Sequence, residues 1–489
     1  MASPDISFTQ IPSNVRKSGV YLEENTSNAL SGLAATSDKI VIIAQKTASG
    51  IVASKTPTLI FDDATAALDF GQGSIAHLSA KAALEANPNA SITVLPVDDN
   101  GSTKAAGQIA VSGTSANGGA IAIFIGDVEI DVSIGQGWTA AQGATGIVGA
   151  IQAVQNTLPV VATLSGNNVI LTAKNAGTLG NEIPTNLTYS VGSTGMVGTI
   201  TQLTGGAADP DLGDYASAGT VLNAIAGASY TIIANTLHDA TNMGKVKNLV
   251  EFVSGPMEQR PAIQVTAATD EFGSFATVTA ATALFNHGRT TYAYTSFASG
   301  SVAKTESFKL TGAYAAELAA TTDPVVPYDG LPLVGTATPT VVDRFTRTQQ
   351  EAALNSGTTP LIVAPGEQLS ICRAISTYVT NSLGSPDPTL LDITTIRTLD
   401  YVRFQVLVRL QNVFVRAKLS TKTPARVVTQ VLDVLYQLQA LEIVQNVDLY
   451  KSQVIAQRDT SDVGRIDVSI PANIVTGLHV IAGVISLKF

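Results

Sequence analysis

The spacing of apolar and polar positions changes several times along this chain, and each change predicts a different element. Lys39-Ile-Val-Ile-Ile-Ala is typical of a buried strand, Ala76 to Ala86 has the spacing of a helix, and a second strand is expected from Ile92. Beyond residue 207, three strand patterns alternate with three helical patterns. The strands are expected at 230–234, 262–266 and 291–295, and the helices at 242–253, 274–285 and 307–320. This βαβαβα order predicts a parallel sheet covered by helices.

Between the first strands and this alternating part, the residue composition of the chain changes. Residues 101–206 are crowded with Gly, Ala, Thr, Ser and Asn and contain very few Lys or Arg. Alternating runs at 121–125 and 128–134 predict half-exposed strands, and a helix is expected from Thr139 to Gln155. We interpret residues 101–206 as a β-rich domain inserted into the core.

Two helices are expected near the C-terminus. No turn signal interrupts residues 391–419 over nearly thirty positions, which favours a helix because strands rarely exceed about ten residues. A second helix begins near Pro424 and places six apolar residues on one face. These are Val427, Val431, Val434, Leu435, Leu438 and Leu441. The last stretch, from Ile474 to Phe489, is again rich in strand-forming residues.

Composition indicates a subunit of an assembly. The chain has 489 residues, 45% apolar and only 13% charged, whereas about a quarter of an ordinary soluble protein is charged. Such a chain has ample apolar surface for several folded domains, which excludes disorder. The formal net charge of −10 argues against nucleic acid as the main partner, because phosphate binding needs concentrated Lys and Arg.

Cysteine content and hydropathy favour a chain made in the cytosol. Cys372 stands alone, so no disulfide framework is possible, and a buried spare thiol is its ordinary role. The opening Met1-Ala-Ser-Pro-Asp-Ile lacks the basic flank and apolar stretch of a signal peptide. No run approaches the 18 apolar residues of a membrane span, so we expect no membrane insertion.

Motifs for enzymatic chemistry are scarce. The four histidines, His77, His238, His287 and His479, have no metal-ligand spacing, and no Gly-x-Ser-x-Gly or Gly-Lys-Ser/Thr motif occurs. Gly71-Gln-Gly-Ser is explained by a tight turn into the following helix. The adjacent pairs Asp62-Asp63 and Asp98-Asp99 are expected on solvated turns. We therefore expect no cofactor and no metal, although an active site assembled from distant residues stays possible.

Both ends of the chain combine a strand-prone segment with separation from the predicted domains. A segment of this kind can complete the sheet of a neighbouring subunit, because an edge strand offers unpaired N–H and C=O groups. It can equally pair within its own subunit, and the sequence leaves both possibilities open.

Several motifs, in order, resemble one family. Ile11-Pro-Ser-Asn-Val-Arg-Lys-Ser-Gly-Val-Tyr-Leu-Glu resembles the opening of sheath proteins from the contractile tails of Mu-like bacteriophages. Further stretches agree over nearly the whole chain: Phe70-Gly-Gln-Gly-Ser, Ala86-Asn-Pro-Asn-Ala, Leu203-Thr-Gly-Gly-Ala, Gly255-Pro-Met, Asp343-Arg-Phe-Thr-Arg, Leu391-Asp-Ile-Thr-Thr-Ile-Arg-Thr-Leu-Asp-Tyr-Val-Arg, and Arg465-Ile-Asp-Val followed by Pro471. The chain departs from the family pattern in two places. Lys17-Ser18 stands where the family has an apolar residue and a proline before the glycine, and the residues after Arg403 are more apolar than the charged run usual there.

The resemblance implies a structural machine. Sheath subunits polymerise as a helical cylinder around a tail tube and contract to drive the tube through the host envelope. The implied partners are other copies of the chain, the tail tube protein, and the baseplate and tail terminator proteins. The implied location is the tail of a virion, with assembly in the host cytoplasm.

The resemblance also implies which residues join subunits. Donated strands are expected within Gly19–Glu24 and Gly477–Phe489, with a hairpin of the C-terminal domain as acceptor. Their expected residues are Gly19, Val20, Tyr21, Leu22, Glu23, Val480, Ile481, Val484, Ile485, Leu487 and Phe489. Five cations are candidates for contact with the tube or a neighbour: Arg397, Arg403, Arg409, Arg416 and Lys418. On an ideal helix Arg409 and Arg416 lie close together while Arg403 points elsewhere, so a single binding stripe is not predicted.

We thus predict a multidomain α+β or α/β chain: a mixed α/β core built from N- and C-terminal parts, a β-rich insertion and extended terminal arms. The expected parts are an arm at 1–30, core at 31–100, inserted outer domain at 101–206, α/β core at 207–390, inner C-terminal domain at 391–476 and a donated strand at 477–489. Two alternatives stay open, an α/β enzyme with a β-rich accessory domain and a glycan-binding surface protein.

Overall fold

The computed structural model describes residues 16–20, 33, 38–99, 103–189, 195–297 and 300–488. The chain divides into two compact units. The main unit comprises residues 37–401 and 474–489, and the second, here called the C-terminal unit, comprises residues 402–473 with the N-terminal segment. Each unit is described by itself.

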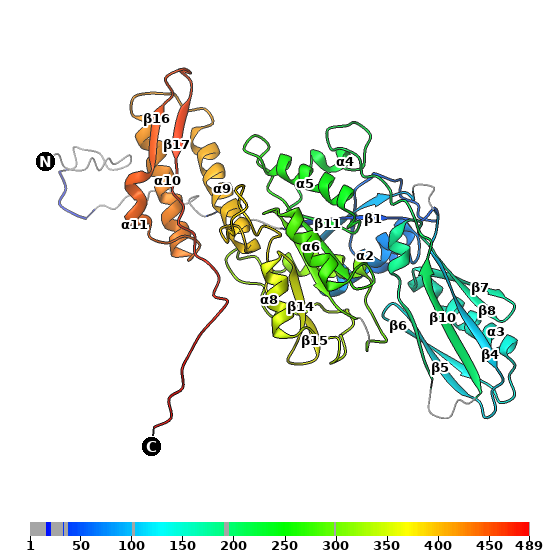
Figure 1. Cartoon of the computed structure of the whole chain (residues 1–489). Helices are drawn as coiled ribbons and strands as arrows, with labels where there is room; N and C mark the ends of the chain where they lie inside the picture. The colour runs from blue at the N-terminus through cyan, green and yellow to red at the C-terminus, as the bar shows by residue number, and fades with distance from the viewer. Residues whose placement is uncertain are drawn as a thin grey trace. The chain divides into compact units, whose positions relative to one another are not determined.

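An eight-stranded sheet forms the centre of the main unit, in the order β15-β14-β13-β12-β11-β1-β3-β2 (Figure 1). All neighbours from β14 to β3 are parallel, and the edge strands β15 and β2 are antiparallel. The predicted parallel α/β sheet is therefore confirmed. The strands are β1 Lys39–Gln45, β2 Thr58–Ile60, β3 Ser91–Val97, β11 Ile232–Asn235, β12 Ile263–Thr269, β13 Thr290–Thr295, β14 Thr359–Ala364 and β15 Gln368–Ile371.

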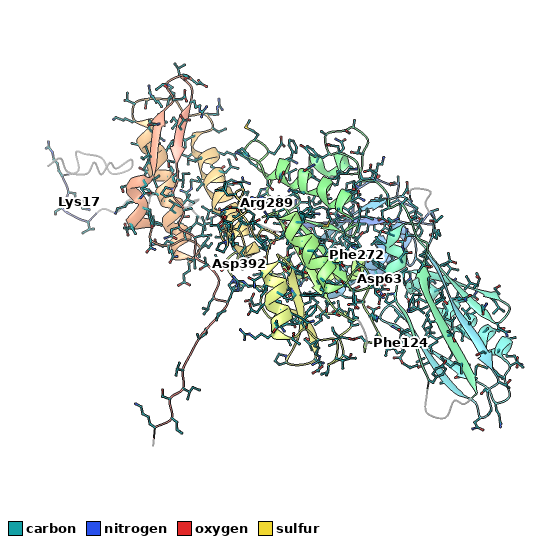
Figure 2. The ribbon with its side chains drawn as sticks, viewed as in Figure 1. Lys17, Asp63, Phe124, Phe272, Arg289 and Asp392 are labelled. Atoms are coloured by element: carbon teal, nitrogen blue, oxygen red, sulfur yellow. The ribbon has the colours of Figure 1, made fainter. Side chains whose placement is uncertain are left out.

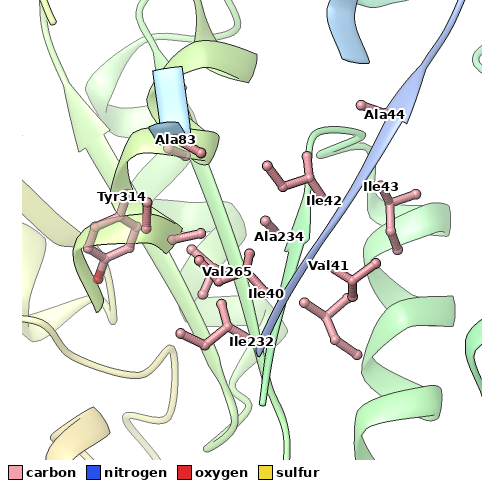
Figure 3. Close-up of a cluster of buried hydrophobic side chains, with 14 of the residues drawn as sticks. Ile40, Val41, Ile42, Ile43, Ala44, Ala83, Ile232, Ala234, Val265 and Tyr314 are labelled. Atoms are coloured by element: carbon pink, nitrogen blue, oxygen red, sulfur yellow. The ribbon is translucent and has the colours of Figure 1, made fainter. Parts of the chain in front are cut away.

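Helices cover both faces of this sheet, so its central strands are buried along nearly their whole length. In Figure 3, Ile42 of β1 faces the side of Ala83 and Tyr314, whereas Val41 and Ile43 project to the other side. Helices α2 and α7 pack against each other and against the central strands. The helices of the sheet region are α1 Asp63–Phe70, α2 Ile75–Ala86, α4 Asn223–Ala226, α5 Ala240–Ser254, α6 Phe275–Phe285, α7 Ser307–Leu318 and α8 Arg347–Asn355.

Residues 105–203 build a separate hydrophobic core from two sheets and one helix. One sheet has the order β10-β4-β8-β7 and the other β6-β5-β9. Helix α3, Ala140–Val154, begins with a capping box between Thr139 and Gln142, as the predicted start at Thr139 requires. The other elements are β4 Ala106–Gly113, β5 Gly119–Ile125, β6 Val128–Ile134, η1 Gln155–Thr157, β7 Val160–Ser165, β8 Asn168–Ala173, η2 Thr178–Glu182, β9 Thr185–Tyr189 and β10 Met196–Thr204.

The long helix α9, Ile393–Phe414, crosses from the main unit into the C-terminal unit and ends before the predicted residue 419. The chain turns after Phe414, whose carbonyl accepts a hydrogen bond from the N–H of Ala417 at 3.0 Å. Helix α10 then spans Thr423–Ala440 with Pro424 in its first turn. Five of the six residues of its predicted face are buried, but Leu441 lies beyond the last helical residue and is 54% exposed.

The C-terminal unit ends in a β-hairpin. Strands β16, Ile455–Arg458, and β17, Ile466–Ser469, pair antiparallel after α11, Val447–Tyr450, and η3, Lys451–Gln453. The carboxylate of Asp459 accepts hydrogen bonds from the N–H groups of Ser461 and Asp462 at 2.6 and 2.7 Å, which closes the turn. β16 packs against α10. No helix among the described residues has the length and hydropathy of a membrane span.

Candidate assembly interface

The C-terminal arm, residues 480–488, is an apolar segment exposed to solvent. It forms neither helix nor strand, and every residue in it is exposed. Its predicted contact residues Val480, Ile481, Val484, Ile485 and Leu487 are 77%, 83%, 92%, 101% and 77% exposed. Burying one such side chain contributes about 1.5–3 kcal/mol, so the arm would gain substantially from a cover that its own chain does not supply. Phe489 lies outside the described residues.

The predicted donated strand begins at Gly477, and here the structure differs. His479 lies against the main unit, with its Nδ1 2.6 Å from Oδ2 of Asp329. Gly477 passes so close to Pro327 that a Cβ on the glycine would stand 2.5 Å from the proline Cγ. Gly477 and His479 are therefore engaged in their own subunit, and the continuously exposed segment begins at Val480.

Little of the predicted N-terminal strand falls within the described residues. Gly19 and Val20 are exposed and form no strand, and the Val20 side chain is 89% exposed. Tyr21, Leu22 and Glu23 lie outside the described residues.

The hairpin β16–β17 offers open sheet edges. It is a two-stranded sheet, and in the part of the chain that the structure describes no third strand pairs with it. Each strand therefore has one side whose alternate N–H and C=O groups point away from the ladder. Ile455 at the start of β16 is 53% exposed. Two-stranded sheets are marginal on their own, so added strands would stabilise this hairpin.

Among the five predicted cations, Arg397 is used inside the main unit. Its guanidinium donates hydrogen bonds to the carbonyl of Leu318 at 2.9 Å, to the Tyr328 hydroxyl and to the Asp38 carboxylate. Burial alone would lower the pKa of Arg397, but Tyr328 and Asp38 raise it above its usual value. A side chain with these partners holds the start of α9 to the sheet.

The remaining four cations do not form one surface. Arg409 bridges α9 to α10 through Asp433, with Nη1 2.6 Å from Oδ2, and Arg403 is half-buried on α9. Arg416 and Lys418 are exposed and follow the end of α9. The predicted proximity of Arg409 and Arg416 assumed a helix that continues through both, and α9 ends at Phe414.

The crevice where doubly wound sheets usually bind ligands is filled by the chain itself. β3 and β11 lie on opposite sides of β1, and the carboxyl ends at such a reversal form the common binding crevice. Here Asn175 donates to the carbonyl of Lys46 at 3.0 Å, and Gln45 donates to that of Ala176 at 2.7 Å. Asp99 accepts hydrogen bonds from Gln45, Asn175 and Ala176, so it is not the solvated turn residue that we predicted.

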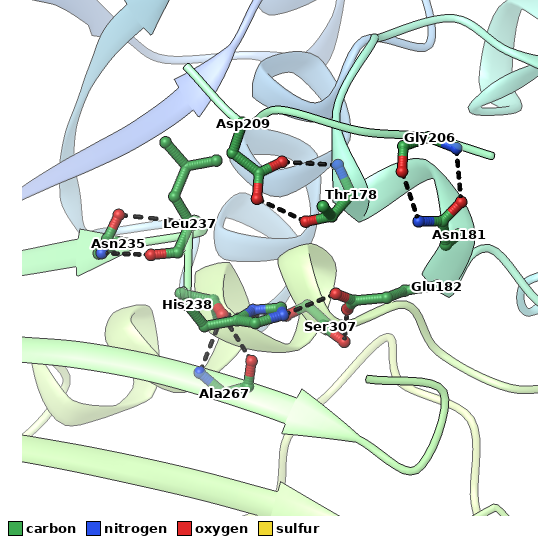
Figure 4. A network of polar contacts seen from close by, with 11 residues as sticks. Thr178, Asn181, Glu182, Gly206, Asp209, Asn235, Leu237, His238, Ala267 and Ser307 are labelled. Carbon is green, nitrogen blue, oxygen red and sulfur yellow. Dashed lines mark hydrogen bonds and ion pairs between the residues drawn. The ribbon is translucent and has the colours of Figure 1, made fainter. Parts of the chain in front are cut away.

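A second set of polar contacts joins the same crevice to the region of 105–203 (Figure 4). Glu182 of η2 accepts hydrogen bonds from Nε2 of His238 and from the Ser307 hydroxyl, both at 2.7 Å. Burial lowers the pKa of His238, but the charge of Glu182 and its hydrogen bond outweigh burial and raise it. Asp209 binds both the N–H and the hydroxyl of Thr178, at 2.6 and 2.5 Å.

A buried ion cluster completes this joint. Lys309 of α7 lies 2.7 Å from Asp127, in the β5–β6 turn, and 2.9 Å from Glu306. Glu306 is fully buried, and burial first and the Asp127 charge second raise its pKa to about 7, against the opposing effect of Lys309. We call the contacts of Asn175, Glu182 and Asp127 with the sheet region the buried joint.

Each of the four histidines has a hydrogen-bond partner within the chain. Nδ1 of His77 accepts from the N–H of Gly73 at 2.8 Å and its Nε2 lies 2.8 Å from Asp63, which we had expected on a solvated turn. Burial, aided by Lys247 and Arg289, lowers the pKa of His287 to about 3. Among the described residues, no three His, Cys, Asp or Glu side chains are grouped to hold a metal ion.

Comparison with known proteins identifies sheath proteins. Residues 385–488 match the family described as "Phage tail sheath C-terminal domain". The chain is 27% identical to the Mu-like prophage FluMu tail sheath protein of Haemophilus influenzae, over 98% of each of the two chains.

Solved structures show the same fold. The chain superimposes with a TM-score of 0.52 on a chain of the anti-feeding prophage baseplate in the contracted state, at 12% identity over 98% of this chain and 99% of that one. It superimposes with a TM-score of 0.50 on the sheath tail protein Lin1278 from Listeria innocua, at 14% identity over 92% and 95%. The resemblance predicted from the motifs is confirmed: the chain carries a phage tail sheath C-terminal domain and is similar over nearly its whole length to the tail sheath protein of a Mu-like prophage.

Proposed function

We propose that this sheath subunit joins its neighbours by adding its C-terminal arm to the hairpin β16–β17 of another copy. The observation that carries the proposal is the exposure of five apolar side chains on residues 480–488. An exposed apolar segment of this length is rare in a protein that acts alone, and it commonly marks an interaction site.

The hairpin and the arm both have backbone groups that a shared ladder would pair. The arm has unpaired backbone groups and branched side chains that favour strands, and the hairpin has open edges. Strand addition satisfies the backbone of both partners through main-chain hydrogen bonds. Because donor and acceptor are different surfaces, the contact repeats from copy to copy and generates a helix when its rotation does not close.

The N-terminal segment around Gly19–Glu24 is proposed as the second donated strand, supported by the exposure of Val20. Arg416 and Lys418, which are exposed, are the proposed contacts with an acidic tube or neighbour. The tail tube protein, the baseplate and the tail terminator are the proposed partners, and the host cytoplasm is the proposed place of assembly.

We also propose that the chain has no catalytic role and needs no cofactor. The filled crevice at the carboxyl ends of β1, β3 and β11 supports this proposal, because the usual ligand position of such a sheet is taken by Asn175 and Ala176. Contraction would then be driven by contacts between subunits that are better satisfied in the short form. The inserted residues 101–206 are proposed to face outward from the cylinder, where an extra domain does not obstruct contraction.

A matched pair of arm variants tests strand donation. Ile485→Pro removes a backbone donor and cannot continue a ladder, whereas Ile485→Thr keeps the backbone donor and the β-branched shape. We expect wild type and Ile485→Thr to form cylinders in negative-stain micrographs, and Ile485→Pro and a chain lacking 480–489 to stay soluble subunits. Normal cylinders from the chain lacking 480–489 would exclude the proposal.

A further inference from the structure

The root of the C-terminal arm is fastened to the main unit. Side-chain exposure changes sharply from one residue to the next: Leu478 and Val480 are 71% and 77% exposed, whereas the imidazole of His479 between them is 12% exposed. Two residues earlier, Gly477 lies directly over Pro327, with no room for a Cβ. The chain is therefore held at two points immediately before it becomes exposed.

The ring of His479 lies between two carboxylates of the main unit. Its Nδ1 is 2.6 Å from Oδ2 of Asp329, and its Nε2 is 3.6 Å from Oδ1 of Asp392. Asp392, labelled in Figure 2, is held by a bidentate pair with Arg373 at 2.8 and 2.9 Å. Asp392 is therefore paired with Arg373, whereas Asp329 makes the short contact with the His479 ring.

We propose that His479 is an anchor that ties the arm to the main unit of its own subunit. The inference rests on the proposed strand donation and adds to it the point from which the arm reaches out. A pull exerted by the neighbour on the arm would be taken up by Asp329 and Asp392, and therefore by the sheet-containing unit, before it reaches the hairpin unit.

The anchor also fixes the reach of the arm. Residues 480–489 are ten residues, which span at most about 33–36 Å when extended. The carbonyl of Asn473 accepts a hydrogen bond from the N–H of Gln445 at 2.8 Å, so without the anchor the free segment would begin after Asn473 and contain at most sixteen residues. A longer tether lowers the effective concentration of the arm at its acceptor. The anchored arm should therefore bind its neighbour more strongly than an unanchored arm would.

A spin label on the unassembled protein tests the anchor directly. The parent chain carries Cys372→Ser, Ile481→Cys as the labelling site, and Ile485→Pro to prevent strand addition. We expect a restricted nitroxide spectrum in this parent and a mobile one when His479→Ala is added. Asp329→Asn, which keeps the shape of the carboxylate, should give an intermediate spectrum. Leu478→Ala, a change in an exposed neighbour, should leave the spectrum unchanged.

Equal spectra for the parent and His479→Ala would overturn the anchor, as would an equal gain in mobility from Leu478→Ala. In otherwise wild-type chains we expect His479→Ala to form cylinders that dissociate at lower urea concentration than those of the wild type, because only the tether has changed. Unchanged dissociation would also count against the anchor.

The two proposals fail separately. If the chain lacking 480–489 assembles while His479 still restricts the label, the arm is anchored but not donated. If the deletion blocks assembly while His479→Ala has no effect on the label, the arm is donated but not anchored.

Discussion

At the scale of single residues, the fold depends on charges that burial makes costly. Glu306 is the clearest case, because burial and the Asp127 charge raise its pKa to about 7. Its partner Lys309 follows three residues later, but Asp127 is separated from both by more than 170 positions. Sequence reasoning assigned Ser307 to Ala320 to a helix without any indication that its first turn receives a carboxylate from residue 127. Periodicity reports which face is apolar, not which distant charge meets it.

Glu306 should make stability depend on pH. Its folded pKa lies above the value of 4.5 for a free side chain, so the folded state binds the proton more tightly. The contribution of Glu306 to the free energy of unfolding should therefore be largest below pH 4.5 and should be lost as the pH rises through about 7. A shift of this size is worth up to about 3 kcal/mol.

The measurement compares Glu306→Gln with its parent, both carrying Ile485→Pro, by urea unfolding at pH 5 and pH 8. Subtracting the two chains removes contributions of other groups, including His238 and His287. We expect the loss between pH 5 and pH 8 to be smaller in Glu306→Gln. Equal losses in both chains would show that Glu306 does not titrate in this range.

At the scale of elements, the apolar pattern predicted the type and order of the helices and strands better than it predicted their ends. The helix expected from residue 391 ends at Phe414, because a turn at Ala417 leads into Pro424. Leu441 fits the apolar face of α10 in spacing, but the helix stops one residue earlier and leaves it exposed. Helix ends depend on local turns and caps, which the spacing of apolar residues does not encode.

The β5–β6 turn tests how tightly the buried joint is packed. Gly126 and Gly166 both lie in turns between adjacent strands and have nearly equal φ values of +64° and +61°. A Cβ at Gly126 would stand 2.2 Å from Oε1 of Glu306, whereas one at Gly166 would have nothing within 4 Å. Glu306 cannot simply move aside, because it is fully buried and paired with Lys309.

Gly166→Ala should therefore cost only the strain of the left-handed backbone, about 1–2 kcal/mol. Gly126→Ala should cost more, and the difference between the two variants measures the packing of the joint. Urea unfolding of chains that carry Ile485→Pro supplies both values. Equal destabilisation by the two substitutions would mean that the joint is loose in solution.

At the scale of the whole molecule, the class and the function were predictable, and the attachment of the arm was not. Alternating strands and helices predicted the sheet, and the ordered motifs predicted a sheath protein. The sequence left open whether the C-terminal strand pairs within its own subunit or with a neighbour, because a segment rich in strand-forming residues fits both outcomes. The structure divides the segment at His479, with Gly477 against Pro327, His479 against Asp329 and residues 480–488 exposed. That division depends on two carboxylates far away in the sequence.

The arm should act as a separable ligand if it joins subunits as proposed. A fluorescent peptide of residues 480–489 should bind the chain that lacks this segment, because the hairpin then has no donor. Hydrogen exchange should slow in residues 455–469 on binding, since β16 or β17 gains a new ladder partner. A peptide with Ile485→Pro should bind far more weakly, because proline interrupts that ladder. An excess of the first peptide should also shorten cylinders of the full chain, by occupying acceptors that neighbouring arms would fill. Protection confined to other segments would locate the acceptor outside the hairpin and refute this part of the proposal.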